Sequence, residues 1–161
     1  AGLPETAIAE VFASRITFTP GGAILVATMK AQGAHTALVS GGFTAFTARV
    51  AAALGLDEHR ANRLGVADGR LTGHVADPIL GREAKVAALK EVCARPGLAE
   101  SEAMAVGDGA NDLGMLARAG ADVALHAKPA VAAAAPLRID HGDLTALLSL
   151  QGIPRDAFVA P

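Results

Sequence analysis

Two carboxylates and an amide gather in the segment Val106-Gly107-Asp108-Gly109-Ala110-Asn111-Asp112, which continues a short apolar run. At the end of a buried strand, Asp108 would offer the hard oxygen atoms that Mg²⁺ prefers, alongside water and a substrate phosphate. Asp108 is therefore the candidate metal ligand. Capping of a following helix accounts for Asn111 or Asp112, but it leaves Asp108, between two glycines, unexplained.

A second segment whose residues could bind a ligand is Val39-Ser40-Gly41-Gly42-Phe43-Thr44, which joins a predicted strand to a predicted helix. Glycines let the backbone turn sharply and bring its N–H groups close to a ligand. The following helix N-terminus favours phosphate, and the Ser40 hydroxyl adds one more donor. The alternative is a tight turn with Ser40 as the helix N-cap, and this short motif alone leaves both interpretations open.

Lys85 is the third candidate, early in a predicted helix over residues 82–94. A cation in the first turns opposes the helix dipole at a cost of roughly 0.3–1 kcal/mol. Composition alone therefore predicts a solvated surface lysine. If Lys85 instead reaches a phosphate site, its replacement is still expected to leave stability unchanged or slightly higher, because the clash with the dipole is relieved. Cys93 lies on the apolar stripe of the same helix and is predicted to be a core residue.

The elements that must position these side chains alternate along the chain. Strands are predicted for the short apolar runs 34–39, 103–106, 123–125 and 137–139, and helices for 5–13, 22–31, 43–54, 82–94, 113–119 and 144–150. This alternation predicts parallel βαβ units and a doubly wound α/β sheet, in which ligands bind beyond the carboxyl ends of the strands. Asp68-Gly69 predicts the turn of a small β-hairpin flap over residues 61–75.

Composition narrows the function classes. The 161 residues suit one domain over residues 1–161, and a net charge of −2 with only five Phe and no Trp or Tyr argues against a nucleic-acid partner. No apolar stretch approaches the ~18 residues of a membrane span. The single cysteine excludes an internal disulfide and predicts a reducing, cytoplasmic location.

Taken together, the motifs resemble the haloacid dehalogenase superfamily of phosphohydrolases. The resemblance covers about residues 3–150, and among the members of the superfamily it is strongest to those that hydrolyse O-phospho-L-serine. It is carried by an ordered series of short segments: Leu3-Pro4, Thr19-Pro20-Gly21, LVSGGFT (38–44), ANRLGVADGRLTG (61–73), VGDGANDLGML (106–116) and HAKP (126–129).

The resemblance implies a Mg²⁺-dependent phosphomonoesterase that forms an aspartyl-phosphate intermediate, with a place in serine biosynthesis. It also implies roles by matching position: Ser40 and the Gly41 amide hold the transferring phosphoryl group, Lys85 neutralises its charge, Asp108 is the Mg²⁺ ligand, Asn111 contacts substrate or phosphate, and Asp112 positions Lys85. Positioning and charge neutralisation of this kind carry most of the catalysis in phosphoryl transfer.

One part of the family pattern is missing. The family begins with a strand that ends in D-x-D-x-T or D-x-D-x-V and supplies the nucleophile and the general acid/base, and no such sequence occurs here. Residues 1–20 match the end of the family's helical cap. We expect an N-terminally truncated core domain that is inactive alone, although a separate segment could complete the fold.

Two other functions stay open. The first is a phosphatase or phosphotransferase of this superfamily that acts on another small phosphomonoester. The second is a non-catalytic regulatory module that retains the phosphate site. The expected partner in the leading interpretation is a small phosphorylated substrate, phosphoserine, with neither nucleic acid nor membrane, and the sequence indicates no oligomeric state.

Overall fold

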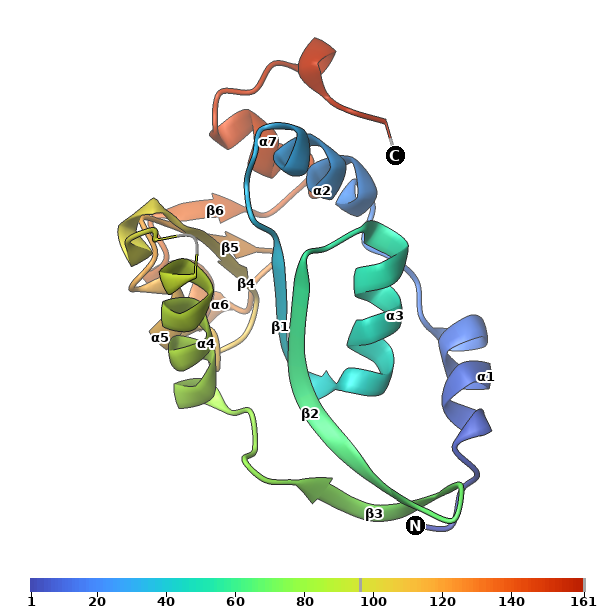
Figure 1. The fold of residues 1–161 in the computed structure, drawn as a ribbon. Helices are drawn as coiled ribbons and strands as arrows, with labels where there is room; N and C mark the ends of the chain where they lie inside the picture. Colours follow the sequence, from blue (N-terminus) through green and yellow to red (C-terminus); the bar gives the residue numbers. More distant parts are fainter. Residues whose placement is uncertain (96, 161) are drawn as a thin grey trace. The chain divides into compact units, whose positions relative to one another are not determined.

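The computed structural model describes residues 1–95 and 97–160, which form two compact units. The first unit holds Ala1–Ile79 together with residues 143–160, and the second holds Leu80–Gly142. The helices and strands of the first unit are α1 (Thr6–Arg15), α2 (Gly22–Ala31), β1 (Ala37–Phe43), α3 (Thr44–Leu54), β2 (Glu58–Ala67), β3 (Arg70–Ala76) and α7 (Ala146–Leu150) (Figure 1). Those of the second are α4 (Arg82–Ala94), β4 (Met104–Gly107), α5 (Leu113–Leu116), β5 (Ala121–Leu125), α6 (Pro129–Ala134) and β6 (Leu137–Ile139).

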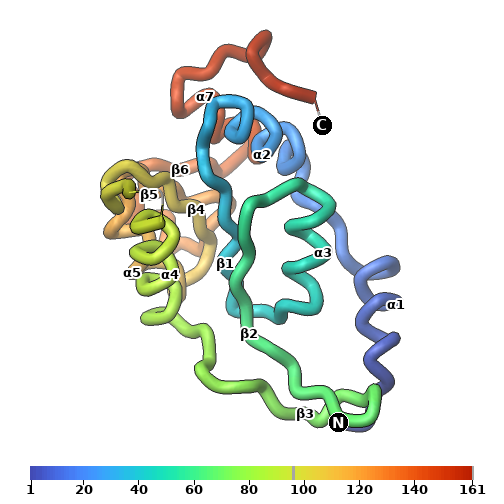
Figure 2. The backbone as a smooth tube through the Cα atoms, viewed as in Figure 1, coloured from blue at the N-terminus to red at the C-terminus, as the bar shows by residue number. Residues whose placement is uncertain are grey.

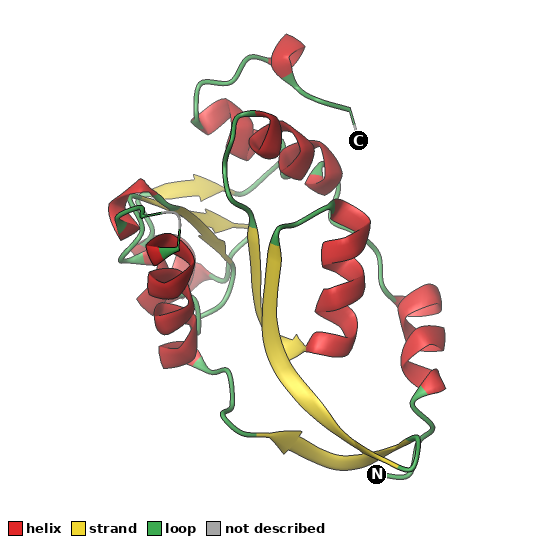
Figure 3. Ribbon diagram, in the orientation of Figure 1, coloured by secondary structure: helices red, strands yellow, loops and turns green. Residues whose placement is uncertain are grey.

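The first unit is built on a three-stranded sheet of order β1-β2-β3. β1 and β2 run parallel and are joined through α3, which packs against both strands (Figure 3). Two apolar residues of α7, Leu147 and Leu148, are buried, and α7 packs against α2. The predicted parallel βαβ unit is therefore present around the Ser40 segment.

The predicted hairpin is also present, as the antiparallel pair β2 and β3. Ala67 pairs with Arg70, and the two residues between them, Asp68 and Gly69, have φ of 50° and 70°. Positive φ at both central positions is the type I′ turn that matches the twist of two strands. β2 begins at Glu58, three residues before the predicted start of the hairpin at residue 61. Its first residues pair with β1 through the backbone and therefore need no apolar side chains.

The second unit contains a fully parallel sheet of order β4-β5-β6, with α5 and α6 as the crossovers. Figure 2 shows the backbone course through these three strands. Its core is a cluster of small and medium apolar side chains from the helices and from β4 and β5: Leu89, Cys93, Ala105, Met115, Leu116, Ala124, Val131 and Ala135. Cys93 is a core residue, as predicted, and burial raises the pKa of its thiol.

The α/β class with parallel strands is confirmed, and the described strands form two three-stranded sheets. The strand predicted for residues 34–39 lies at Ala37–Phe43, so it continues through the Ser40 segment rather than stopping there. The helix predicted for residues 113–119 ends at Leu116. Among residues 1–95 and 97–160, no helix is long and apolar enough to cross a membrane.

Asp57, which precedes β2, contacts residues of two other segments of the first unit, Lys30 in α2 and Thr36 before β1. Its carboxylate accepts hydrogen bonds from the backbone N–H and the hydroxyl of Thr36, both at 2.8 Å, and lies 2.9 Å from the Lys30 ammonium. The Thr36 backbone N–H, followed by Lys30, lowers the pKa of Asp57 from its ordinary 3.8 to about 2. Asp57 thus links the end of α2 to the starts of β1 and β2.

We expect the stabilisation from Asp57 to be complete above pH 3.8 and to disappear as the pH falls through about 2, because folding favours the ionised carboxylate. Asp57→Asn should lower the free energy of unfolding by about 1 kcal/mol at neutral pH, the scale of a solvent-screened ion pair. Urea unfolding at several pH values measures this. A wild-type advantage that stayed constant down to the lowest pH would contradict the assignment.

Candidate functional site

Asp112 is the centre of the candidate site in the second unit. Its side chain is buried, and Oδ1 lies 2.5 Å from the Nζ of Lys85, which is buried as well; the two residues are 4% and 6% exposed. The second oxygen, Oδ2, accepts hydrogen bonds from the backbone N–H of Asp108 at 3.3 Å and of Gly109 at 3.1 Å. One carboxylate therefore joins the helix α4 to the loop that follows β4.

Two glycines of this loop, Gly107 and Gly109, leave room for neighbouring side chains that come very close to the backbone. A Cβ on Gly107 would lie 2.5 Å from the Cβ of Asp112, and a Cβ on Gly109 would lie 2.5 Å from Oδ1 of Asn111. Real Cβ atoms do not come so close to other heavy atoms, so a larger residue at position 107 would displace the Asp112 side chain, and one at position 109 would displace the side-chain amide of Asn111. The order Gly-Asp-Gly thus lets the loop fold around the Asp112 carboxylate.

Lys85 is not the solvated surface lysine that composition predicts. It lies in the first turn of α4, where its backbone N–H donates a hydrogen bond to the Gly81 carbonyl at 3.1 Å. Its side-chain ammonium, however, is buried against Asp112. Removal of the lysine would leave a buried carboxylate without its cation, which is strongly destabilising. The expectation that its replacement leaves stability unchanged is therefore wrong.

Asp108 presents its carboxylate at the surface, directly after β4. Its backbone atoms are engaged, since its N–H donates to Asp112 and its carbonyl accepts from the Lys128 N–H at 3.1 Å. In the part of the chain that the structure describes, no group donates a hydrogen bond to the Asp108 carboxylate. The side chain of Asn111 is exposed on the same loop.

These residues fit a magnesium ion only in part. Asp108 offers an accessible oxygen donor, whereas both oxygens of Asp112 are occupied by Lys85 and by backbone amides. Residues 1–95 and 97–160 contain no group of three His, Cys, Asp or Glu side chains that could enclose a metal. Asp108 can therefore serve as one ligand, and water, substrate phosphate or other protein groups must supply the rest.

The helix-capping interpretations of both segments are wrong. Phe43 precedes α3 and no side chain caps that helix, because β1 continues through Ser40 to Phe43. Asp112 precedes α5 but makes no cap hydrogen bond, since its carboxylate turns back toward the loop and Lys85. The Ser40 and Asp112 side chains thus bond to neighbouring backbone N–H groups and, for Asp112, to Lys85, instead of capping a helix.

Ser40, Gly41 and Gly42 form an irregular stretch of β1 in the first unit. The Ser40 hydroxyl accepts a hydrogen bond from the Gly42 N–H at 3.0 Å, and both glycines are exposed. The Gly41 carbonyl accepts from the side-chain amide of Asn62 at 2.8 Å. Sequence reasoning missed Asn62; the signal that could have found it is a polar residue within the ANRL run of the hairpin motif.

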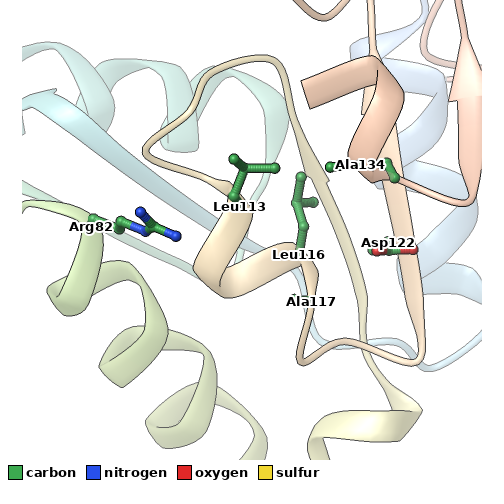
Figure 4. A pocket seen from close by; sticks show the side chains of 7 residues that line it. Arg82, Leu113, Leu116, Ala117, Asp122 and Ala134 are labelled. Carbon is green, nitrogen blue, oxygen red and sulfur yellow. The ribbon is translucent and has the colours of Figure 1, made fainter. Parts of the chain in front are cut away.

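A pocket of about 260 Å³ lies elsewhere in the second unit (Figure 4). It is lined by Arg82, Leu113, Leu116, Ala117, Asp122, Ala134 and Ala135. Its walls are mostly aliphatic, and none of the predicted site residues lines it. The pocket is therefore separate from the Lys85–Asp112 pair, and we assign it no ligand.

The site so far consists of a buried lysine–aspartate pair and an accessible carboxylate that directly follows a parallel strand. The sequence pattern of the haloacid dehalogenase-like hydrolases matches residues 1–117. The chain belongs to the haloacid dehalogenase-like hydrolase family.

Two of the similar proteins with a named activity are phosphoserine phosphatases. The phosphoserine phosphatase of Albidiferax ferrireducens is 46% identical over an alignment of 153 residues that covers 92% of this chain and 65% of that protein. The phosphoserine phosphatase of Streptomyces coelicolor is 42% identical over 160 residues, 99% of this chain and 39% of that protein. The chain thus spans less than two thirds of the length of these two relatives.

Solved structures agree with this placement. A probable phosphoserine phosphatase from Vibrio cholerae matches 97% of this chain with a TM-score of 0.90 and 34% identity, over 48% of its own length. A substrate-bound phosphoserine phosphatase complex matches 92% of this chain with a TM-score of 0.87 and 37% identity, over 70% of its length. The fold is therefore that of these phosphatases.

Proposed function

We propose that the protein to which this chain belongs is a phosphoserine phosphatase that hydrolyses O-phospho-L-serine to serine and inorganic phosphate in the cytoplasm. The observation that carries the proposal is the buried ion pair of Lys85 and Asp112, seated on the glycine-rich loop after β4. A buried ammonium that one carboxylate holds in place is a preorganised site for a second anion. The similarity to named phosphoserine phosphatases supports phosphoserine as that anion.

Each candidate residue has a role in this proposal. In the second unit, Lys85, oriented by Asp112, neutralises phosphoryl charge. In the first unit, the Ser40 hydroxyl and the Gly41 amide are donors for phosphoryl oxygens. Asn111, exposed on the loop before α5, contacts substrate or phosphate. Because serine is the product, the reaction belongs to serine biosynthesis.

The nucleophile lies outside these 161 residues. We propose that the complete protein supplies it from a D-x-D-x-[TV] strand, with residues 1–20 as the end of a cap and residues 61–75 as a flap on a single core domain. In that protein an aspartate attacks phosphorus and displaces serine, and water then hydrolyses the aspartyl-phosphate to release phosphate. Asp108 would hold the Mg²⁺ that neutralises charge on the phosphoryl oxygens.

A panel of phosphomonoesters tests the proposed function on the complete protein. Phosphoserine should give the highest kcat/KM, and inorganic phosphate should be released at the same rate with or without acceptor alcohols. Faster hydrolysis of another phosphomonoester would change the substrate, and phosphorylated alcohol among the products would indicate a phosphotransferase. Binding of phosphate with no turnover of any compound would indicate a regulatory module.

Asp108→Asn should weaken the response to Mg²⁺ in the complete enzyme. The amide keeps the shape of the side chain but removes the negative charge that Mg²⁺ prefers. We expect the Mg²⁺ concentration for half-maximal rate to rise, on the order of 10-fold as for lost metal-site contacts. Titration of activity with MgCl₂ measures this. A wild-type titration curve and rate in the variant would assign Asp108 to the loop structure alone.

A further inference from the structure

Asn62 is a buried polar residue that the proposed reaction does not use. It lies on β2, opposite Phe43 in the register, and is 7% exposed. Its Nδ2 donates a hydrogen bond to the Gly41 carbonyl at 2.8 Å. A buried amide is retained only where its hydrogen bonds are made, so the position of Asn62 is coupled to that of the Ser40–Gly42 segment.

The segment needs such support because it departs from the ladder between β1 and β2, which lie side by side (Figure 1). Val39 pairs with Arg60 and Phe43 pairs with Asn62, so the three residues 40–42 of β1 face the single residue Ala61 of β2. The extra residues of such a bulge lose their regular strand partners. The Asn62 side chain replaces one of them at the Gly41 carbonyl.

The peptide between Gly41 and Gly42 is fixed at both of its ends. Its carbonyl oxygen accepts from Asn62 at 2.8 Å, and its N–H donates to the Ser40 hydroxyl at 3.0 Å. The peptide unit is planar, so two hydrogen bonds in opposite directions fix its orientation. Without them, the orientation of this peptide would be less restrained, because glycine has the greatest backbone freedom.

The same arrangement orients the Ser40 hydroxyl. Since Oγ accepts the hydrogen bond from Gly42, its own hydrogen remains available to donate to another acceptor. We propose that Asn62 is a positioning residue for phosphate binding: it fixes the Gly41–Gly42 peptide so that the Ser40 hydroxyl and the Gly41 N–H are preorganised for the phosphoryl oxygens. This inference rests on the proposed function and adds to it a residue that touches no substrate.

The test compares variants of the complete protein at a temperature where each is fully folded by circular dichroism. Asn62→Leu keeps the size but removes the donor. We expect it to lower kcat/KM for phosphoserine about 10–100-fold, the scale for loss of an outer-shell partner or a small misplacement of binding groups. Its affinity for inorganic phosphate should fall about 10-fold, because fixed donors become mobile.

The pH profile separates positioning from general loss of structure. An ionised carboxyl only accepts hydrogen bonds, whereas a protonated one donates. Asn62→Asp should therefore recover activity relative to wild type as the pH falls, while Asn62→Leu should stay equally impaired at every pH. A purely structural role for Asn62 predicts no such recovery.

Thr28→Val is the matched control. Thr28 is fully buried in the same unit, and its hydroxyl accepts from the Val159 N–H at 2.9 Å, so its loss also removes a buried side chain–backbone hydrogen bond. Because Thr28 lies away from the Ser40–Gly42 segment in the chain, we expect wild-type kinetics and phosphate affinity from this variant.

The outcomes separate the two proposals. If the wild type hydrolyses phosphoserine and Asn62→Leu keeps its kcat/KM and phosphate affinity, the role of Asn62 is overturned and the proposed function stands. If the wild type binds inorganic phosphate but hydrolyses nothing, the proposed function fails, and the phosphate affinity of the variants still decides the role of Asn62. A wild type that neither hydrolyses phosphoserine nor binds phosphate overturns both.

Discussion

The 161-residue chain by itself is expected to release no phosphate from O-phospho-L-serine, with or without Mg²⁺. The D-x-D-x-[TV] sequence that would supply the nucleophile does not occur in it. When a covalent nucleophile is removed, only binding and electrostatic positioning remain, and the loss in kcat can reach about 10⁶-fold, as for the nucleophile of a serine protease. A malachite-green phosphate assay on protein of verified mass measures this.

The control for that experiment is the complete protein, prepared and assayed in the same way. Its turnover shows that the assay and the metal concentration are adequate. Phosphate release by the 161-residue chain that increased with its concentration, and that Lys85→Ala abolished, would contradict the prediction. It would mean that a residue within the chain acts as the nucleophile.

Local signals in the sequence predicted much of the fold. The bounds of α2, α4 and β6 agree with the predicted residues, because Gly, Pro and hydrophobic spacing mark the ends of short elements locally. The hairpin was predictable from Asp68-Gly69 for the same reason, since a type I′ turn depends on two adjacent residues.

Contacts between distant residues were not predictable in this way. Lys85 and Asp112 are 27 positions apart, and nothing in the helical pattern around Lys85 indicates a buried carboxylate beside it. Asn62 and Gly41 are 21 positions apart and meet only because a bulge in β1 turns the Gly41 carbonyl toward β2. Burial of a polar side chain depends on a partner that only the fold supplies.

This difference matters for the choice of candidate residues. The neighbourhood of Asp108 indicates its role, because glycines on either side and a preceding apolar run place it at a strand end. For Lys85 only the family resemblance indicates a role, and the structure adds the physical reason for its position, a buried ion pair with Asp112. The carboxylate of Asp112 is what keeps the ammonium in a site from which water is largely excluded.

Lys85→Ala is expected to lower kcat/KM of the complete enzyme by about 10²–10³-fold. At 4 Å and an effective dielectric constant near 20, one charge pair with phosphate is worth on the order of 4 kcal/mol before desolvation is subtracted. Loss of a transition-state contact of this kind costs about 2.7–4 kcal/mol. Steady-state kinetics with phosphoserine measures it. Lys85→Arg should not restore the rate fully, because a planar guanidinium differs in shape from a compact ammonium.

The same substitution should also reduce stability, and a double variant separates the two effects. Breaking a buried ion pair by removing one partner costs about 3–5 kcal/mol, because the other charge remains buried alone. Lys85→Met with Asp112→Asn removes both charges and keeps similar volumes, so most of the free energy of unfolding should return while kcat/KM stays low. If the double variant regained activity together with stability, Lys85 would be a structural residue whose charge serves only Asp112. If it regained stability alone, the ammonium itself would be required for the reaction.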